Sequence, residues 1–96
     1  DGKPDIVVGN MNTNTAGVLL NTDTGTFLSQ TTYSTSTNPL YLAVGDVNND
    51  GKPDIVVPNF GSNNIGVLLN AGNGTFPSQS TYPAGTQPAA VAIADV

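Results

Sequence analysis

One nine-residue segment, residues 46–54, carries oxygen-bearing side chains at alternating positions, which is the arrangement that a hard metal ion requires. Ca²⁺ takes six to eight oxygen ligands at about 2.3–2.6 Å, and a tight loop with alternate side chains turned inward supplies them from a short stretch of chain. Mg²⁺ fits less well because it demands a stricter octahedron and keeps its waters. We therefore expect a calcium site with side-chain ligands at loop positions 1, 3, 5 and 9, namely Asp46, Asn48, Asp50 and Asp54.

Two further residues suit the same loop. Gly51, at position 6, permits the sharp turn. Lys52, at position 7, can offer a metal only its backbone carbonyl, and its ammonium is expected to point to solvent. The segment also matches the first half of an EF-hand loop, but Val57 stands at position 12, where that loop needs a bidentate Glu. Both flanks moreover read as strands and not as helices, so the EF-hand interpretation fails.

A simpler interpretation of this loop needs no metal. Asp50-Gly51 would form an ordinary hairpin turn, and the other acidic side chains would be solvated. Three carboxylates within nine residues repel one another in such a turn, whereas a divalent ion converts the repulsion into attraction. The metal site is the interpretation that also explains why the same loop occurs twice.

The second copy of the loop is divided between the two ends of the sequence. Asp95 corresponds to Asp46, while Asp1 and Asp5 correspond to Asp50 and Asp54. If another chain brings its Asp1 and Asp5 beside this Asp95, we expect a weaker, intermolecular calcium site.

The elements that must position these loops follow from an internal repeat of 49 residues. Residues 1–47 align with residues 50–96 without a gap, and more than half of the aligned positions are identical. A period near 50 is typical of propeller blades. Each period holds four short runs bounded by Gly, Pro, Asn or Asp, with no helical periodicity, so we expect an all-β fold of four-stranded antiparallel meanders. The expected strands of one blade are residues 40–46, 54–59, 65–70 and 75–82.

The chain 1–96 consists of two repeats, residues 1–49 and 50–96. The ends of these repeats do not coincide with the boundaries of the expected blades. One complete blade is expected at about 39–82, preceded by three strands of another blade and followed by an orphan first strand at about 89–95. Propellers normally remove such an unpaired edge by closing the ring, so we expect another chain or flanking repeats to complete it. Identical copies would form a homo-oligomer with an even number of blades, or a filament if the contact does not close.

Composition and charge exclude several kinds of partner. The net charge is -5 and the only cations are Lys3 and Lys52, so there is no basic face for nucleic acid or anionic lipid. No apolar run approaches the roughly 20 residues of a membrane helix, and membrane insertion is not expected. Because cysteine is absent, neither a disulfide framework nor a thiolate metal site can form. The many neutral Thr, Asn, Ser and Gln side chains are common in secreted β-proteins, which favours an extracellular or cell-surface location.

The loop 46–54, followed by Ile55-Val56-Val57 and then by Asn59-Phe60-Gly61, resembles the FG-GAP, or VCBS-type, repeat of integrin α-subunit propellers and of many microbial surface proteins. The resemblance extends over both repeats, although the first has Met11-Asn12 in place of Phe60-Gly61. It implies a calcium-stabilised β-propeller whose ligands are Asp46, Asn48, Asp50, Lys52 through its carbonyl, and Asp54. It does not imply one function, because integrin-like propellers bind proteins and similar fungal propellers bind sugars.

The function expected from the sequence is that of a non-catalytic extracellular scaffold or adhesion module that binds a protein partner. Its calcium would be structural, with an affinity in the extracellular range of about 10⁻⁴–10⁻³ M. The alternative is a lectin that recognises a glycan, in which aromatic rings stack on sugars. An enzyme is not expected, because the sequence has no His, Cys, Glu or Arg to form the usual nucleophile and acid–base pairs. The aromatic candidates for the lectin are Tyr33, Tyr41, Phe60 and Tyr82.

Two hairpin residues have a simple and a functional interpretation. Asp23 is expected to lie in a solvated turn. Asn73-Gly74-Thr75 matches the N-glycosylation pattern, but Asn-Gly is also a good hairpin turn, and the turn is the safer interpretation.

Overall fold

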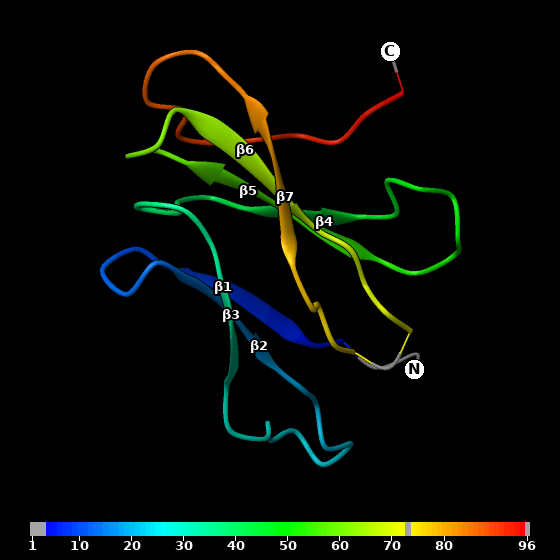
Figure 1. Cartoon of the computed structure of the whole chain (residues 1–96). Helices are drawn as coiled ribbons and strands as arrows, with labels where there is room; N and C mark the ends of the chain where they lie inside the picture. The colour runs from blue at the N-terminus through cyan, green and yellow to red at the C-terminus, as the bar shows by residue number, and fades with distance from the viewer. Residues whose placement is uncertain (1–3, 73, 96) are drawn as a thin grey trace.

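The computed structural model describes residues 4–72 and 74–95, which form two antiparallel sheets and, over that part of the chain, no helix (Figure 1). The first sheet has three strands in the order β1-β2-β3 and the second has four in the order β4-β5-β6-β7, so each is a simple meander. The prediction of an all-β fold of antiparallel blades is therefore confirmed. The strands are β1 (Ile6–Asn10), β2 (Thr15–Leu19), β3 (Thr31–Ser34), β4 (Ala43–Gly45), β5 (Asp54–Asn59), β6 (Asn64–Leu68) and β7 (Gln79–Pro83).

Several strand bounds differ from the sequence expectation, and the strand expected at 65–70 is β6, which ends at Leu68. The strand expected at 40–46 is shortened to β4. The backbone N–H of Leu40 donates to the carbonyl of Pro58, whereas Ala43 pairs with Val56. Three steps along this segment therefore face two steps along β5, and the extra residue interrupts the ladder as a bulge does. The last strand of the blade begins at Gln79 and not at residue 75. Residues 89–95 form no strand, only one isolated bridge at Ala90, since they have no second strand to pair with over the described part of the chain.

The core of the molecule lies between the two sheets, which pack face to face. Its buried members come from both blades, and half-buried Val7, Leu20, Tyr33 and Leu42 pack around them. The ring of Tyr33 meets that of Phe76 edge to face, with centroids 5.4 Å apart. Each blade therefore covers a face of the other, as expected for a repeat that cannot bury its apolar face alone. The buried core residues are Val18, Ile55, Val57, Leu68 and Phe76.

The connection between the blades explains the Phe60-Gly61 pair. Phe60 donates to the carbonyl of Asn38 and Gly61 donates to that of Thr37, both at 3.0 Å. A Cβ on Gly61 would lie 2.7 Å from the Thr37 methyl carbon, so a larger residue would force the Thr37 side chain to shift. The pair thus fastens the end of β5 to the segment that enters the blade.

A polar cluster recurs inside each sheet. In the second blade, Asn59 is fully buried and its Nδ2 donates to Asn64 Oδ1 at 2.9 Å and to Gln79 Oε1 at 3.2 Å. The amide of Gln79 lies against Gly66, where any side chain would collide with it. Asn10, Gln30 and Gly17 repeat this arrangement in the first blade, so the two blades share side-chain packing as well as topology.

No helix formed by the described residues is long and apolar enough to cross a membrane.

Candidate metal centre

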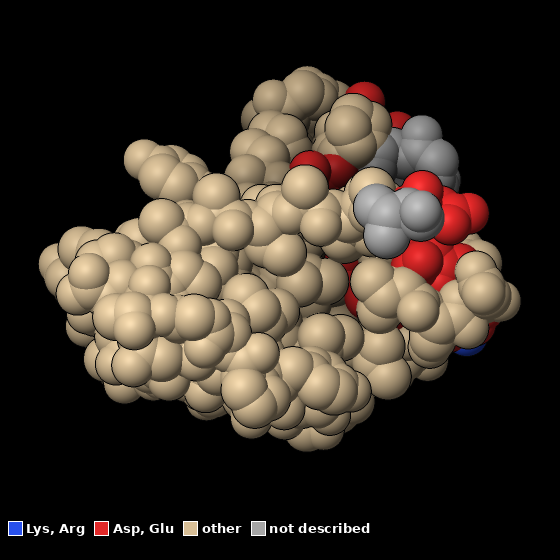
Figure 2. Space-filling view, turned by 90° about the horizontal axis from the view of Figure 1, so that it is seen from above, with Lys and Arg blue, Asp and Glu red and all other residues tan. Residues whose placement is uncertain are grey.

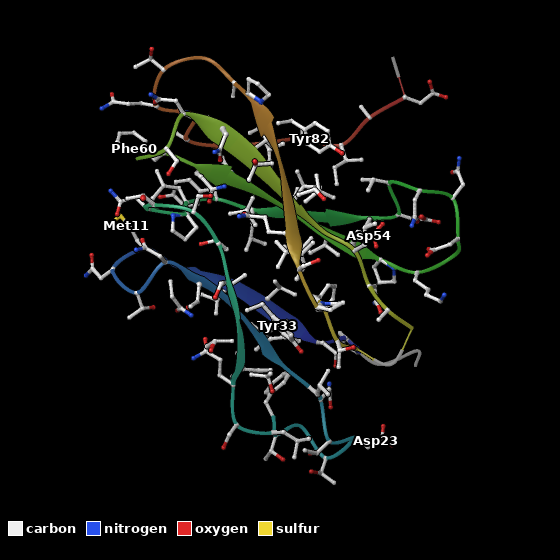
Figure 3. All side chains as sticks on the ribbon, viewed as in Figure 1. Met11, Asp23, Tyr33, Asp54, Phe60 and Tyr82 are labelled. Carbon is white, nitrogen blue, oxygen red and sulfur yellow. The ribbon has the colours of Figure 1, made fainter. Side chains whose placement is uncertain are left out.

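The acidic loop joins β4 to β5. It lies at one end of these strands, and Phe60 lies at the opposite end of β5. Figure 3 shows Asp54 and Phe60 near opposite ends of the four-stranded sheet, and Figure 2 shows acidic side chains gathered at one end of the molecule. The loop begins at Asp46, directly after β4, and ends at Asp54, the first residue of β5. Because Gly45 pairs with Asp54, the ladder itself brings the two ends of the loop together.

The structure gathers three of the predicted ligands. One carboxylate oxygen from each of Asp46, Asp50 and Asp54 lies within 4.8 Å of the others. Two oxygens that are each 2.3–2.6 Å from one calcium ion are separated by at most about 5.2 Å, so this spacing fits a shared ion. All the donors are oxygens, which suits a hard cation and not a soft one.

Asp46 is the centre of the turn. Its Oδ2 accepts from the backbone N–H of Gly51 at 2.8 Å, and its Oδ1 accepts from those of Asp50 at 3.2 Å and Asn48 at 3.3 Å. The bond from Gly51 contributes most to lowering the pKa of this carboxyl below its ordinary value, and the other backbone donors add to it. The loop therefore holds Asp46 as an anion. Gly51 has φ of 81°, a left-handed conformation that favours glycine.

Asp54 is the buried member of the set and joins three segments. Its side chain is fully buried. Its Oδ2 accepts from the backbone N–H of Val47 at 3.0 Å, and its Oδ1 accepts from that of Asn70, beyond the end of β6, at 2.9 Å. Asn70 also donates through Nδ2 to the carbonyl of Pro53 at 3.0 Å. Sequence reasoning missed Asn70, although its recurrence as Asn21 at the 49-residue offset was a visible signal.

The remaining predicted ligands lie in the exposed part of the loop. Asp50 Oδ1 accepts from the backbone N–H of Lys52 at 2.9 Å, and its Oδ2 lies 3.9 Å from Lys52 Nζ. The Lys52 side chain is 46% exposed, so this ion pair is screened by water and weak. Asn48 is exposed and contributes its backbone N–H to Asp46. Each carboxylate oxygen that accepts one hydrogen bond keeps a second lone pair for a cation.

Of the divided copy of the loop, the structure describes Asp5 and Asp95, and neither belongs to a group of three described acidic residues close enough for a metal. Asp5 keeps the contact of its counterpart Asp54: its Oδ1 accepts from the backbone N–H of Asn21 at 2.9 Å. Asp5 is nevertheless exposed, and so is Asp95. The only group of three acidic residues close enough for a metal, among those that the structure describes, is the one in residues 46–54. Asp1, the third predicted member of the divided site, lies outside the described residues.

The predicted sugar-stacking aromatics separate into two groups. Tyr41 is 77% exposed and Tyr82 is 58% exposed. Phe60 is half-buried, while Tyr33 belongs to the interblade core and donates from its hydroxyl to the carbonyl of Gly74 at 3.3 Å. Tyr33 is therefore a packing residue and not a free platform.

The two hairpin residues are placed only in part. Asp23 is exposed in its turn with φ of 82°, and its N–H donates to Asn21 Oδ1 at 2.8 Å. Asn73, the possible glycosylation site, lies outside the described residues.

Comparison with known proteins gives two family matches. A family model described as an FG-GAP-like repeat matches residues 1–57, more than half of the chain. A second, described as an FG-GAP repeat, matches residues 42–76, which contain the acidic loop, β5, β6 and the contact of Asp54 with Asn70. No curated protein and no solved structure matches the chain.

Proposed function

Because the chain belongs to the FG-GAP-like repeat family, we propose that it is a non-catalytic, calcium-stabilised module of β-propeller type that works in adhesion or recognition outside the cell. FG-GAP repeats are typical of extracellular, propeller-like adhesion modules. Two packed blades of the same design offer surfaces between and across blades for such binding, as in other repeat proteins.

The observation that carries the calcium assignment is the convergence of Asp46, Asp50 and Asp54. Their oxygens lie within 4.8 Å of one another, and Asp54 is fully buried. Three like charges at such distances repel one another, and a divalent ion removes this repulsion. Backbone donors already hold Asp46 and Asp54 in place, so the ion would meet a largely formed site.

The role proposed for calcium is structural. The loop joins β4 to β5, and Asp54 ties that junction to the chain beyond β6. An ion there would fasten three segments of one blade at a single point. Asp50 and Asn48 are exposed, which favours the weaker extracellular range of about 10⁻⁴–10⁻³ M over the affinity of a cytosolic sensor.

Catalysis finds little support in this set of side chains. The sequence has neither His nor Cys, and its ionisable groups are Asp, Tyr and two Lys besides the chain ends. The best-organised carboxylates, those of Asp46 and Asp54, are engaged by backbone N–H groups. They would serve as ligands and not as proton carriers, whose pKa must lie near the working pH.

A second candidate function, carbohydrate binding, is supported by the exposure of Tyr41 and Tyr82. Exposed rings of this kind can stack on sugar rings. Glycan-array binding that Tyr41→Ala or Tyr82→Ala abolishes would favour it. Binding only to protein ligands would favour the adhesion module.

Isothermal titration of the metal-stripped chain with CaCl₂ tests the main proposal. We expect saturable binding that Asp50→Asn weakens at least about tenfold, because one of the clustered carboxylates is lost. Asp23→Asn is the matched control, since it removes the same charge from an exposed turn outside the loop and should leave the affinity unchanged. Equal affinities for the two variants, or heat for Mg²⁺ equal to that for Ca²⁺, would contradict the assignment.

A further inference from the structure

Lys52 places a positive charge between the acidic loop and the hairpin that follows β6. It is the only Lys or Arg among the described residues. The sequence predicts that its ammonium points to solvent, but only 46% of its side chain is exposed. Its Nζ lies 3.9 Å from Asp50 Oδ2, so the charge stands beside one of the three carboxylates proposed to hold calcium.

The backbone of the loop restrains the position from which this side chain extends. The N–H of Lys52 donates to Asp50 Oδ1 at 2.9 Å. The carbonyl of the next residue, Pro53, accepts from Asn70 Nδ2 at 3.0 Å. The loop itself therefore directs Lys52 to the neighbourhood of Asp50.

The far end of the side chain lies against the hairpin at Gly72. A Cβ on Gly72 would lie 3.2 Å from Lys52 Cε and 3.5 Å from its Nζ. Gly72 has φ of 105°, where glycine is favoured, and its N–H donates to Asn70 Oδ1 at 2.8 Å. The hairpin thus presents to the ammonium a residue that has no side chain, and Lys52 joins the hairpin to the loop that holds Asp50.

A positive charge in this position opposes the binding of a second cation. An ion bound to either oxygen of Asp50 at 2.3–2.6 Å would lie within about 9 Å of the present position of Nζ. Like charges repel at such distances, and the repulsion depends on salt because the Debye length is about 30 Å at 0.01 M but about 8 Å at 0.15 M. A divalent ion at Asp50 therefore repels Lys52, whose partly exposed side chain can turn into solvent.

We propose that Lys52 is a tethered cation that calcium must displace from Asp50, and that its charge lowers the calcium affinity of the acidic loop. The inference rests on the proposed calcium site, but it gives a role to a side chain that is not itself a ligand. In the metal-free chain the ammonium reduces the repulsion among the carboxylates of the loop. When calcium binds, the ammonium leaves both Asp50 and Gly72.

Two substitutions separate the charge of Lys52 from the packing of its stem. Lys52→Met keeps an unbranched stem beside Gly72 and removes the charge, whereas Lys52→Arg keeps the charge. Both variants keep the backbone carbonyl of residue 52. Isothermal titration of the metal-stripped wild-type chain and of both variants with CaCl₂, at ionic strengths of about 0.01 M and about 0.15 M, measures their affinities.

Lys52→Met should bind calcium about three to ten times more tightly than the wild-type chain at the lower ionic strength, since one repulsive charge is lost. The difference should shrink at the higher ionic strength, because salt screens exposed charges. Lys52→Arg should bind no more tightly than the wild-type chain. An equal gain in both variants, or a gain that salt does not change, would show that the charge is not the cause and would overturn the proposal.

A second readout follows the displacement itself. In the wild-type chain, the NMR signal of the Lys52 Cε–Hε group should shift and saturate over the same calcium range as the amides of the acidic loop. A signal that stays in place at saturation would overturn the displacement. Saturable binding with the same affinity in the wild-type chain and in Lys52→Met would overturn only the role of Lys52. If none of the three chains binds calcium saturably, the proposed calcium site is wrong, and this inference is wrong with it.

Discussion

The Oδ1 atom of Asp54 lies 2.9 Å from the backbone nitrogen of Asn70, and this contact ties the first residue of β5 to the chain beyond β6. The first repeat keeps the bond between Asp5 and Asn21 at the same distance. In the second repeat the carboxylate is fully buried, whereas in the first it is exposed. The same local hydrogen bond therefore occurs in both blades, but we expect it to contribute more to the stability of the second blade, and this difference can be measured.

Asp54→Asn should destabilise the chain by about 1–3 kcal/mol even in excess chelator, because an amide places a donor against one of the two N–H groups that the carboxylate now accepts. Asp5→Asn should cost less, since water can compensate at an exposed site. Urea unfolding followed by circular dichroism measures both. Equal losses for the two variants would show that burial of Asp54 does not matter.

The lowered pKa of Asp46 predicts acid sensitivity of the loop. Because this pKa is lower in the folded than in the unfolded chain, the contribution of Asp46 is fully present above the ordinary value of 3.8 and is lost as the pH falls through the folded value. In excess chelator, the stability difference between the wild-type chain and Asp46→Asn should shrink from about pH 5 to about pH 2. Urea midpoints across this range provide the measurement, and a difference independent of pH would contradict the assignment.

Gly61→Ala should destabilise the blade junction by about 1–3 kcal/mol, because the added methyl would lie 2.7 Å from the Thr37 methyl carbon. Gly85→Ala is the matched control, since nothing lies within 4 Å of its Cβ position. It should change stability by no more than about 1 kcal/mol, in either direction. Thermal unfolding measures the melting temperature of each variant. Similar melting temperatures would contradict the explanation that a steric contact with Thr37 favours glycine at position 61.

Much of the fold could be predicted because the repeat is nearly regular. Identical segments such as Asp-Gly-Lys-Pro-Asp-Ile-Val-Val fix where a strand begins relative to the acidic loop, and Gly, Asn and Pro mark the turns. The three carboxylates of the loop also follow from spacing, since the β4–β5 ladder closes a loop whose two ends are adjacent. These features depend on local sequence alone.

Other features depend on which strands and sheets surround a segment, and they could not be predicted from the sequence of that segment. The shortening of β4 comes from an extra residue opposite β5, which no pattern in residues 40–46 indicates. The buried contact between Asn59 and Gln79 replaces apolar packing inside a strand and needs Gly66 beside it. The contrast between buried Ile55 and exposed Ile6 arises entirely from which strands and sheets surround them.

The central claim is that residues 46–54 form a calcium site, and a titration of the isotopically labelled chain with CaCl₂ followed by amide NMR shifts tests it most directly. The account predicts saturable shifts concentrated at Asp46, Asn48, Asp50 and Gly51, with a further shift at Asn70, which donates to Asp54. Amides of the turn around Asp23 should stay in place. Shifts that never saturate, or that are no larger in this loop than around Asp23, would contradict the claim.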